Sequence, residues 1–353
     1  MNLLLRDTYL ALKKKNLDGL IVSSEANISY LTGYTCRDAY LIISQKKNIY
    51  LTDSRYIEEM KKNLPNSFSL KKINGSVFTL IAKTCQNLKL KRVGFEERYL
   101  AFGEYQRVKQ GSPIGINLIP THSIIEGLRE IKTAREIEKI EKAIQITVKA
   151  LNFIKGYLSV GKREIEVAGE LEKFIRYQGA SSSAFEIIIA SGPNSSYPHH
   201  ITSQRKLKNN QPVLIDLGVT YKGYKSDLTR VFFLGKITPE FRRVYEIVLE
   251  ANNRAIQGIK PGVKISKIDY FARHYITQKG YGGFFTHNLG HGIGQEVHEE
   301  PHISAREDSP LKPGQIVTIE PAIYLPGKFG IRLEDMVLVT KKGVSNLSGT
   351  LHK

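Results

Sequence analysis

Four carboxylates lie within or directly beside apolar, strand-like stretches, and they constrain the fold of this chain more than any other feature. They are Asp216 in VLIDLG, Asp227 in KSDLTR, Glu320 in VTIEPA and Glu334 in IRLEDM. A carboxylate is rarely buried unless it is paired with a cation or binds a metal ion. One such residue would usually face solvent, but four of them predict a shared site.

The four carboxylates form two pairs, and each pair spans a predicted hairpin. Residues 212–219 and 228–235 have the pattern of two strands joined by YKGYKSD, and residues 316–324 and 331–340 that of two strands joined by LPGKFG. Two such hairpins can bring four carboxylates to one point. Their negative charges then require a cation.

A glycine-rich segment, HNLGHGIGQEVHEEP at residues 287–301, adds three histidines: His287, His291 and His298. Glycine-rich backbone makes a poor helix and a poor core strand, so we expect an irregular segment here. One imidazole among several carboxylates suits divalent ions such as Mn, Co, Fe or Zn. Bridging carboxylates indicate two ions that share a water or hydroxide.

The rest of the chain indicates two domains. Short apolar runs alternate with helical patterns in the first part, as is typical of an α/β domain. A charged stretch at 126–132 precedes a long amphipathic helix predicted over 133–156. We therefore expect an α/β domain over residues 1–126 and an α+β domain over residues 127–353. Strands are predicted at 19–23, 39–44, 48–53, 92–96 and 185–192, and further helices at 54–63, 76–88, 103–110, 164–178, 239–258 and 266–279.

Composition narrows the class of protein. With 41% hydrophobic and 24% charged residues, the chain is typical of soluble globular proteins, and no stretch approaches the ~20 apolar residues of a membrane span. Cys36 and Cys85 alone make no disulfide framework, so we expect a cytoplasmic location. The net charge of +18 comes from lysines scattered in twos and threes. We therefore expect a lysine-rich surface, with neither nucleic acid nor a membrane as partner.

The motifs resemble those of the pita-bread metallopeptidases, which include methionine aminopeptidase, aminopeptidase P and prolidase. IDLGVTYKGYKSDLTR has two aspartates at the spacing of this family, and TIEPAIY and IRLED have its two glutamates. HNLGHGIGQEVHEEP has the metal-binding histidine and a second histidine seven residues later. SGPNSSYPHH, at 191–200, resembles the segment with another active-site histidine, here His199. All five ligand positions are filled, and the resemblance implies a pita-bread fold for the second domain.

The resemblance also implies how the metal ligands divide. Asp216 would chelate one ion, His291 and Glu320 would hold the other, and Asp227 and Glu334 would bridge the two. Small residues beside the histidine would let the backbone approach the metals and the substrate. The implied reaction is peptide hydrolysis by a metal-bridging hydroxide.

The resemblance assigns further residues to catalysis and substrate binding. Glu320 would transfer the water proton toward the leaving nitrogen, and His298 would stabilise the charge on the carbonyl oxygen. His199 would line the cleft as a third catalytic group, and His287 would bind substrate together with His298.

Arg332 and Tyr324 are expected to orient the metal ligands through hydrogen bonds. Arg332 lies two residues before Glu334 in a predicted strand, so both side chains should face the same side. We expect the Arg332 guanidinium to donate hydrogen bonds to Asp216 and to the Tyr324 hydroxyl, because hydrogen-bonding partners of this kind orient metal ligands.

Three features favour the Xaa-Pro branch of the family over methionine aminopeptidase. NISYLTGY and LTDSRY resemble the N-terminal domain of aminopeptidase P, prolidase and creatinase. His287 lies four residues before His291, and Arg332 with Tyr324 completes a pattern that these relatives share. The resemblance implies an Xaa-Pro aminopeptidase that uses two divalent ions and acts on peptides with proline at the second position. Mn²⁺ is the expected metal, with Co, Zn or Fe as alternatives, and a homodimer is the expected assembly.

Other functions stay open at this point. Xaa-Pro dipeptidase, or prolidase, is the main alternative. His302 stands where some relatives have an arginine that would suit the carboxylate of a dipeptide, which favours the aminopeptidase. Creatinase has the fold without metals, and noncatalytic pita-bread modules bind nucleic acid or proteins. The filled ligand positions disfavour both.

Overall fold

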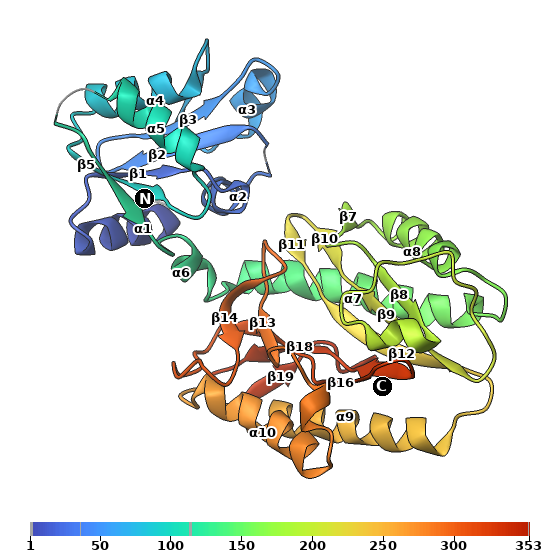
Figure 1. Cartoon of the computed structure of the whole chain (residues 1–353). Helices are drawn as coiled ribbons and strands as arrows, with labels where there is room; N and C mark the ends of the chain where they lie inside the picture. The colour runs from blue at the N-terminus through green and yellow to red at the C-terminus, as the bar shows by residue number, and fades with distance from the viewer. Residues whose placement is uncertain (1–2, 36, 113–114, 352) are drawn as a thin grey trace. The chain divides into compact units, whose positions relative to one another are not determined.

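The computed structural model describes residues 3–35, 37–112, 115–351 and 353, which form two compact units, Met1–Arg129 and Glu130–Lys353 (Figure 1). The expected domain boundary after residue 126 falls at the start of the short helix α6 (Glu126–Arg129), and it stays a prediction. Cys36 lies outside the described residues, and Cys85 is buried and not in a disulfide.

The first unit is built on a six-stranded sheet in the order β4-β3-β2-β1-β5-β6. Leu20 and Val22 of β1 pack on one face with residues of α1, α2 and α3, whereas Ile21 packs on the other with α4 and α5. This alternation explains why both faces of the sheet are apolar. The strands are β1 (Gly19–Val22), β2 (Ala39–Ser44), β3 (Asn48–Thr52), β4 (Phe68–Lys72), β5 (Arg92–Glu96) and β6 (Asn117–Thr121). The helices are α1 (Leu3–Lys14), α2 (Glu25–Thr32), α3 (Ile57–Asn63), α4 (Val77–Asn87) and α5 (Phe102–Gly111).

The expected α/β class of this unit is confirmed, but four elements besides the short helix α6 were not predicted. Two of them, β4 and β6, are the edge strands of the sheet, and they pair in parallel with β3 and β5. Edge strands are partly exposed, so their sequences lack a continuous apolar run. The other two are α1 and α2. Helix α1 buries only a narrow stripe, Leu5, Thr8 and Leu12, which gives a weak helical pattern.

The second unit has two helix pairs with strands between them (Figure 1). Helices α7 (Ala134–Tyr157) and α8 (Glu164–Tyr177) share a hydrophobic core with strand residues within 188–217. Helices α9 (Pro239–Gly258) and α10 (Ile265–Gln278) share another with strand residues within 316–339. These four helices match the predicted positions closely. None of the helices in the described residues is both long and apolar enough to cross a bilayer.

The strands of the second unit form four sheets within the described residues. Their orders are β12-β9-β8, β11-β10-β7, β14-β13-β15-β18-β19 and β16-β17. The first strands are β7 (Ser182–Ser183), β8 (Ile188–Ser191), β9 (Gln211–Leu217), β10 (Val219–Tyr221), β11 (Tyr224–Lys225) and β12 (Leu228–Leu234). The later strands are β13 (Gly290–Gly292), β14 (Glu299–Ile303), β15 (Ile316–Ile319), β16 (Ala322–Leu325), β17 (Phe329–Arg332), β18 (Asp335–Val339) and β19 (Val344–Asn346). Two 3-10 helices, Gly192–Ser196 and Gly282–Phe284, complete the unit.

Both predicted hairpins are present, but the second is interrupted where its glutamates lie. The strand predicted over 316–324 is divided between β15 and β16 at Glu320 and Pro321, and the strand predicted over 331–340 is divided between β17 and β18 beside Glu334. Proline has no N–H to donate to a strand ladder. As a result β15 pairs with β18 in one sheet, while β16 pairs with β17 in another. Each glutamate therefore lies where the chain passes from one sheet to the other.

The glycine-rich segment is more regular than expected, because Gly290–Gly292 forms β13 inside the five-stranded sheet. A Cβ on Gly290 would lie 2.0 Å from the main-chain oxygen of Thr318, and a Cβ on Gly292 would lie 2.1 Å from that of Glu300. These two glycines permit the close approach of neighbouring strands, and Gly290 also lines the cavity.

Gly290→Ala should therefore destabilise the protein by about 3 kcal/mol or more, the upper range for overpacking of a core. Gly169→Ala is the matched control, because a Cβ at this position of α8 meets no atom within 4 Å. It should raise the free energy of unfolding by about 0.5–1 kcal/mol, since alanine is the better helix former. Urea unfolding measures both changes. Equal stability of Gly290→Ala and the unsubstituted protein would contradict the packing described for β13.

Candidate metal centre

The five residues predicted to be metal ligands come together in the second unit. Asp216 lies in β9, Asp227 immediately precedes β12, His291 lies in β13, Glu320 follows β15, and Glu334 precedes β18. All five line one cavity of about 610 Å³. This volume is within the range of small-ligand sites.

The ligand atoms lie close to one another. Single oxygen or nitrogen atoms of Asp227, His291 and Glu334 all lie within 4.8 Å of each other. His291 Nε2 is 3.7 Å from Asp227 Oδ2 and 3.5 Å from Glu320 Oε1. His291 Nδ1 lies 3.0 Å from the Gly292 oxygen, which assigns the ring proton to Nδ1. The lone pair of Nε2 then faces carboxylate oxygens, an arrangement that a metal ion between them would stabilise.

Burial and mutual repulsion shift the pKa values of this cluster strongly. Burial, followed by the charges of the neighbouring carboxylates, raises the pKa of Asp227 and of Glu334 well above the ordinary values. Burial raises the pKa of Glu320 to about 8. Burial lowers the pKa of His291 to about 4, so its ring is neutral at pH 7. Divalent cations would reverse the carboxylate shifts, because they favour the ionised form.

Two carboxylate oxygens in the cluster accept no hydrogen bond and could bind a cation. Among the described residues, Asp216 Oδ1 and Glu334 Oε1 are buried and have no hydrogen-bond partner. Their sister oxygens are held by the protein, since Arg332 donates to Asp216 Oδ2 at 2.5 Å and Thr229 donates to Glu334 Oε2 at 2.7 Å. Buried carboxylate oxygens are rarely left unbonded, so this donor set fits divalent metal ions.

Both hydrogen bonds predicted for Arg332 are present. Besides Asp216, its guanidinium donates to the hydroxyl of Tyr324 at 2.7 Å. Arg332 is the last residue of β17 and Glu334 lies outside the strand, so both side chains line the cavity although the predicted strand is interrupted between them. Arg332 Nε also donates to Thr229 Oγ1 at 3.0 Å, and that hydroxyl donates to Glu334. Thr229 was not predicted, although its position two residues after Asp227 was a usable signal.

The predicted substrate histidines border the same cavity. His199 and His298 are exposed, and the ring of His298 lies 4.4 Å from that of His291 between centroids. His287 is half-buried, with Nδ1 2.7 Å from the Asn288 oxygen and Nε2 3.2 Å from the Tyr324 hydroxyl. Burial, with the charge of Arg332, lowers the pKa of His287 to about 4. Both of its nitrogens are engaged within the protein, so it offers the cavity the carbon surface of a neutral ring.

A buried ion pair that was not predicted holds the segment before His298. Lys132 Nζ lies 3.1 Å from Glu299 Oε2, and their side chains are 1% and 5% exposed. Glu299 Oε1 accepts hydrogen bonds from the main-chain nitrogens of Gln295 at 2.8 Å and Glu296 at 3.1 Å. No motif in the sequence connects Lys132 with this segment.

Glu164 holds the segment that carries His199. Its fully buried carboxylate accepts hydrogen bonds from main-chain or side-chain groups of Ser191, Asn194 and Ser203, and it lies 2.9 Å from Nε2 of His200. The position of Glu164 at the start of a helix gave no sign of this role.

Comparisons with known proteins agree with this geometry. Residues 138–341 match the model of metallopeptidase family M24, and residues 8–131 match that of the creatinase/prolidase N-terminal domain. The Xaa-Pro dipeptidase of Pyrococcus furiosus is 35% identical over 339 residues, which cover 96% of this chain and 95% of the relative. The structure of the Xaa-Pro dipeptidase from Bacillus anthracis has a TM-score of 0.94 and 37% identity, with 98% of this chain and 96% of that one covered. The X-Pro aminopeptidase from Thermotoga maritima has a TM-score of 0.88 and 36% identity, with 96% and 97% covered.

The metal-free protein should lose thermal stability as the pH rises from about 7 to about 8. Glu320 has a pKa of about 8 in the folded protein against an ordinary value of 4.5, so its contribution to stability is lost as the pH rises through the folded value. Asp227 and Glu334 act in the same direction, and His291 and His287 stay neutral throughout this window. Melting temperatures measured with a chelator test this, and Glu320→Gln should weaken the trend. A melting temperature that rises over this window would contradict it.

Proposed function

Because the chain belongs to metallopeptidase family M24, we propose that the cavity of its second unit is the active site of an Xaa-Pro aminopeptidase. The convergence of the five predicted metal ligands, two of them with an unbonded buried oxygen, is the observation that supports this function most directly. The match of the first unit to the creatinase/prolidase N-terminal domain supports the Xaa-Pro branch.

The metal centre would hold two divalent ions. Asp216 would bind one, His291 and Glu320 the other, and Asp227 and Glu334 would bridge them. Bound ions of this kind polarise a substrate carbonyl and lower the pKa of a nearby water, so that it is a nucleophile at neutral pH. We propose Mn²⁺, because oxygen donors with a single imidazole suit it, and Co, Zn and Fe are the alternatives.

The side chains around the centre would move protons and bind the peptide. Glu320 is close enough to His291 to share its ion, and its second role would be to pass the water proton to the leaving nitrogen. His298, beside the ring of His291, would donate a hydrogen bond to the oxygen on which negative charge develops. His199 would assist on the same cavity surface. The carbon surface of His287 suits the apolar ring of a substrate proline.

The charges of the cavity lining support an aminopeptidase that acts on peptides longer than two residues over a dipeptidase. Among the described residues that line it, Arg332 is the one arginine or lysine, and its guanidinium is already bonded to Asp216, Tyr324, Thr229 and the Pro198 oxygen. The carboxylate of a dipeptide would need a cation of its own. Xaa-Pro dipeptidase is the second candidate function, and the similarity to the enzymes of that name from Bacillus anthracis and Pyrococcus furiosus supports it.

We also propose a cytoplasmic homodimer. The compartment is supported by Cys85, which is buried and outside any disulfide. The dimer rests on the resemblance to the family.

Asp227→Ala and Glu334→Ala should each remove both metal ions, because each residue would bridge them. The unsubstituted protein should hold about two divalent ions per chain and lose its activity with a chelator. Asp216→Ala is the matched control, since it should leave one ion in place. Elemental analysis after dialysis measures the metal content. Full activity after thorough removal of metal would rule out the metallopeptidase mechanism for this site.

The enzyme should cleave Ala-Pro-Gly faster than Ala-Pro by about 10-fold or more, as expected when the carboxylate of the dipeptide lacks a charged hydrogen-bond partner. His302→Arg should narrow this difference, because His302 is exposed at the cavity and an arginine there can pair with that carboxylate. Release of the first amino acid measures both rates, with Met-Ala-Ser as the control for methionine aminopeptidase. Cleavage of Ala-Pro alone would favour the dipeptidase, and preference for Met-Ala-Ser would rule out both Xaa-Pro functions.

A further inference from the structure

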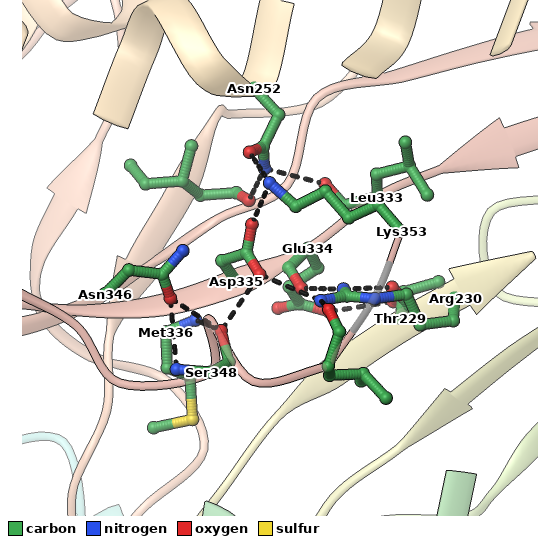
Figure 2. A network of polar contacts seen from close by, with 12 residues as sticks. Thr229, Arg230, Asn252, Leu333, Glu334, Asp335, Met336, Asn346, Ser348 and Lys353 are labelled. Carbon is green, nitrogen blue, oxygen red and sulfur yellow. Dashed lines mark hydrogen bonds and ion pairs between the residues drawn. The ribbon is translucent and has the colours of Figure 1, made fainter. Parts of the chain in front are cut away.

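Each of the two strand breaks that carry Glu320 and Glu334 follows a residue whose buried main-chain oxygen accepts a hydrogen bond from a side chain. Ile319 precedes the first glutamate and Leu333 precedes the second. Buried carbonyl oxygens must be bonded elsewhere when a strand ends. Here one side chain serves both, because Asn252 Nδ2 donates to the Ile319 oxygen at 2.9 Å and to the Leu333 oxygen at 3.1 Å (Figure 2).

Asn252 reaches the two breaks from helix α9 and is fully buried. Its amide has one nitrogen with two hydrogens and one oxygen, so both hydrogens are used by the two carbonyl groups. A single amide group therefore fixes how far apart the two glutamate-bearing segments lie.

Lys353 fixes the orientation of that amide. Its Nζ lies 2.5 Å from Asn252 Oδ1 and 2.5 Å from Asp335 Oδ2 (Figure 2). An ammonium group has no acceptor, so the amide oxygen must face Lys353 and the amide nitrogen must face the two carbonyl groups. A flipped amide would lose all three hydrogen bonds.

Asp335, the residue after Glu334, pairs with Arg230 as well as with Lys353. Asp335 is fully buried, and its Oδ1 accepts hydrogen bonds from Arg230 at 2.9 Å and Ser348 at 2.9 Å. Arg230 also donates to the main-chain oxygen of Glu334 at 2.5 Å. Glu334 is thus held on both sides, by Asn252 through the preceding carbonyl and by Arg230 and Lys353 through the following side chain.

We propose that Asn252 and Lys353 are positioning residues for the metal centre. Neither lines the cavity, so they act through Glu320 and Glu334 by holding the two strand breaks together. This inference rests on the proposed metal-binding function of those glutamates. Its consequence is that loss of the amide donors weakens metal binding even though every ligand is still present.

Asn252→Asp and Lys353→Met are the test variants. Asn252→Asp keeps the size and the acceptor for Lys353 but replaces the donating nitrogen by an oxygen. Lys353→Met removes the ammonium from a side chain that is 16% exposed, so this variant should fold even if the first does not. Asn48→Asp is the matched control in the first unit. Asn48 is buried, and its amide donates to the Ser67 oxygen at 3.2 Å and to the Tyr9 hydroxyl at 2.7 Å.

Binding of Mn²⁺ to the full chain, measured by titration calorimetry, gives the decisive quantity. Asn252→Asp should raise the dissociation constant by ~10–100-fold, the range for partners that orient metal ligands. Lys353→Met should raise it in the same direction, and the two effects should not add, because both act through one amide. Asn48→Asp should lower stability toward urea without changing Mn²⁺ affinity.

Unchanged Mn²⁺ affinity in the Asn252 and Lys353 variants would overturn this inference and leave the proposed function intact. An equal loss of affinity in Asn48→Asp would also overturn it, because the effect would then follow from lower stability alone. Failure of the unsubstituted protein to bind Mn²⁺, Co²⁺, Zn²⁺ or Fe²⁺ would instead overturn the proposed function, and this inference with it.

Discussion

Repulsion between buried carboxylates is the constraint on which the arrangement of the second unit depends. Asp227, Glu320 and Glu334 have raised pKa values because they are buried close to one another and to Asp216. Arg332 is the one permanent cation that the described residues place in the cavity wall, and it cannot neutralise four carboxylates. Bound metal ions would supply the remaining positive charge, and folding would then be linked to metal binding.

The predicted metal ligands and the predicted substrate-binding histidines lie in different structural settings. The ligands lie in strands or directly beside them, and threonine, arginine and asparagine side chains hold them in place. His199 and His298 are exposed. The segments that contain them donate main-chain hydrogen bonds to the buried carboxylates of Glu164 and Glu299. The predicted metal ligands are thus fixed by the sheets, whereas the predicted substrate-binding histidines His199 and His298 lie outside the strands.

The sequence predicted which carboxylates and which histidine come together at one cavity, but it did not predict the residues that hold them in place. Carboxylates in apolar runs leave a clear signal, and the expected hydrogen bond from Arg332 to Asp216 is present although the strand predicted to contain Arg332 and Glu334 is interrupted between them. The break at Glu320 was missed because it depends on which strands pair. Asn252 and Lys132 were missed because they bond to main-chain groups or to a distant carboxylate, and no local pattern records such contacts. Edge strands β4 and β6 were missed because partial exposure removes the apolar run.

The two glycines beside His291 also limit how this centre can change. Because any side chain at Gly290 or Gly292 would meet main-chain oxygens of adjacent strands, the immediate neighbours of the histidine cannot be varied to alter its metal preference. Thr318 is a better position to substitute. Its hydroxyl accepts a hydrogen bond from the main-chain nitrogen of His291 at 3.1 Å and lies 3.4 Å from Glu320 Oε1. An engineer seeking a different metal would do better to vary that hydroxyl than the strand that bears the imidazole.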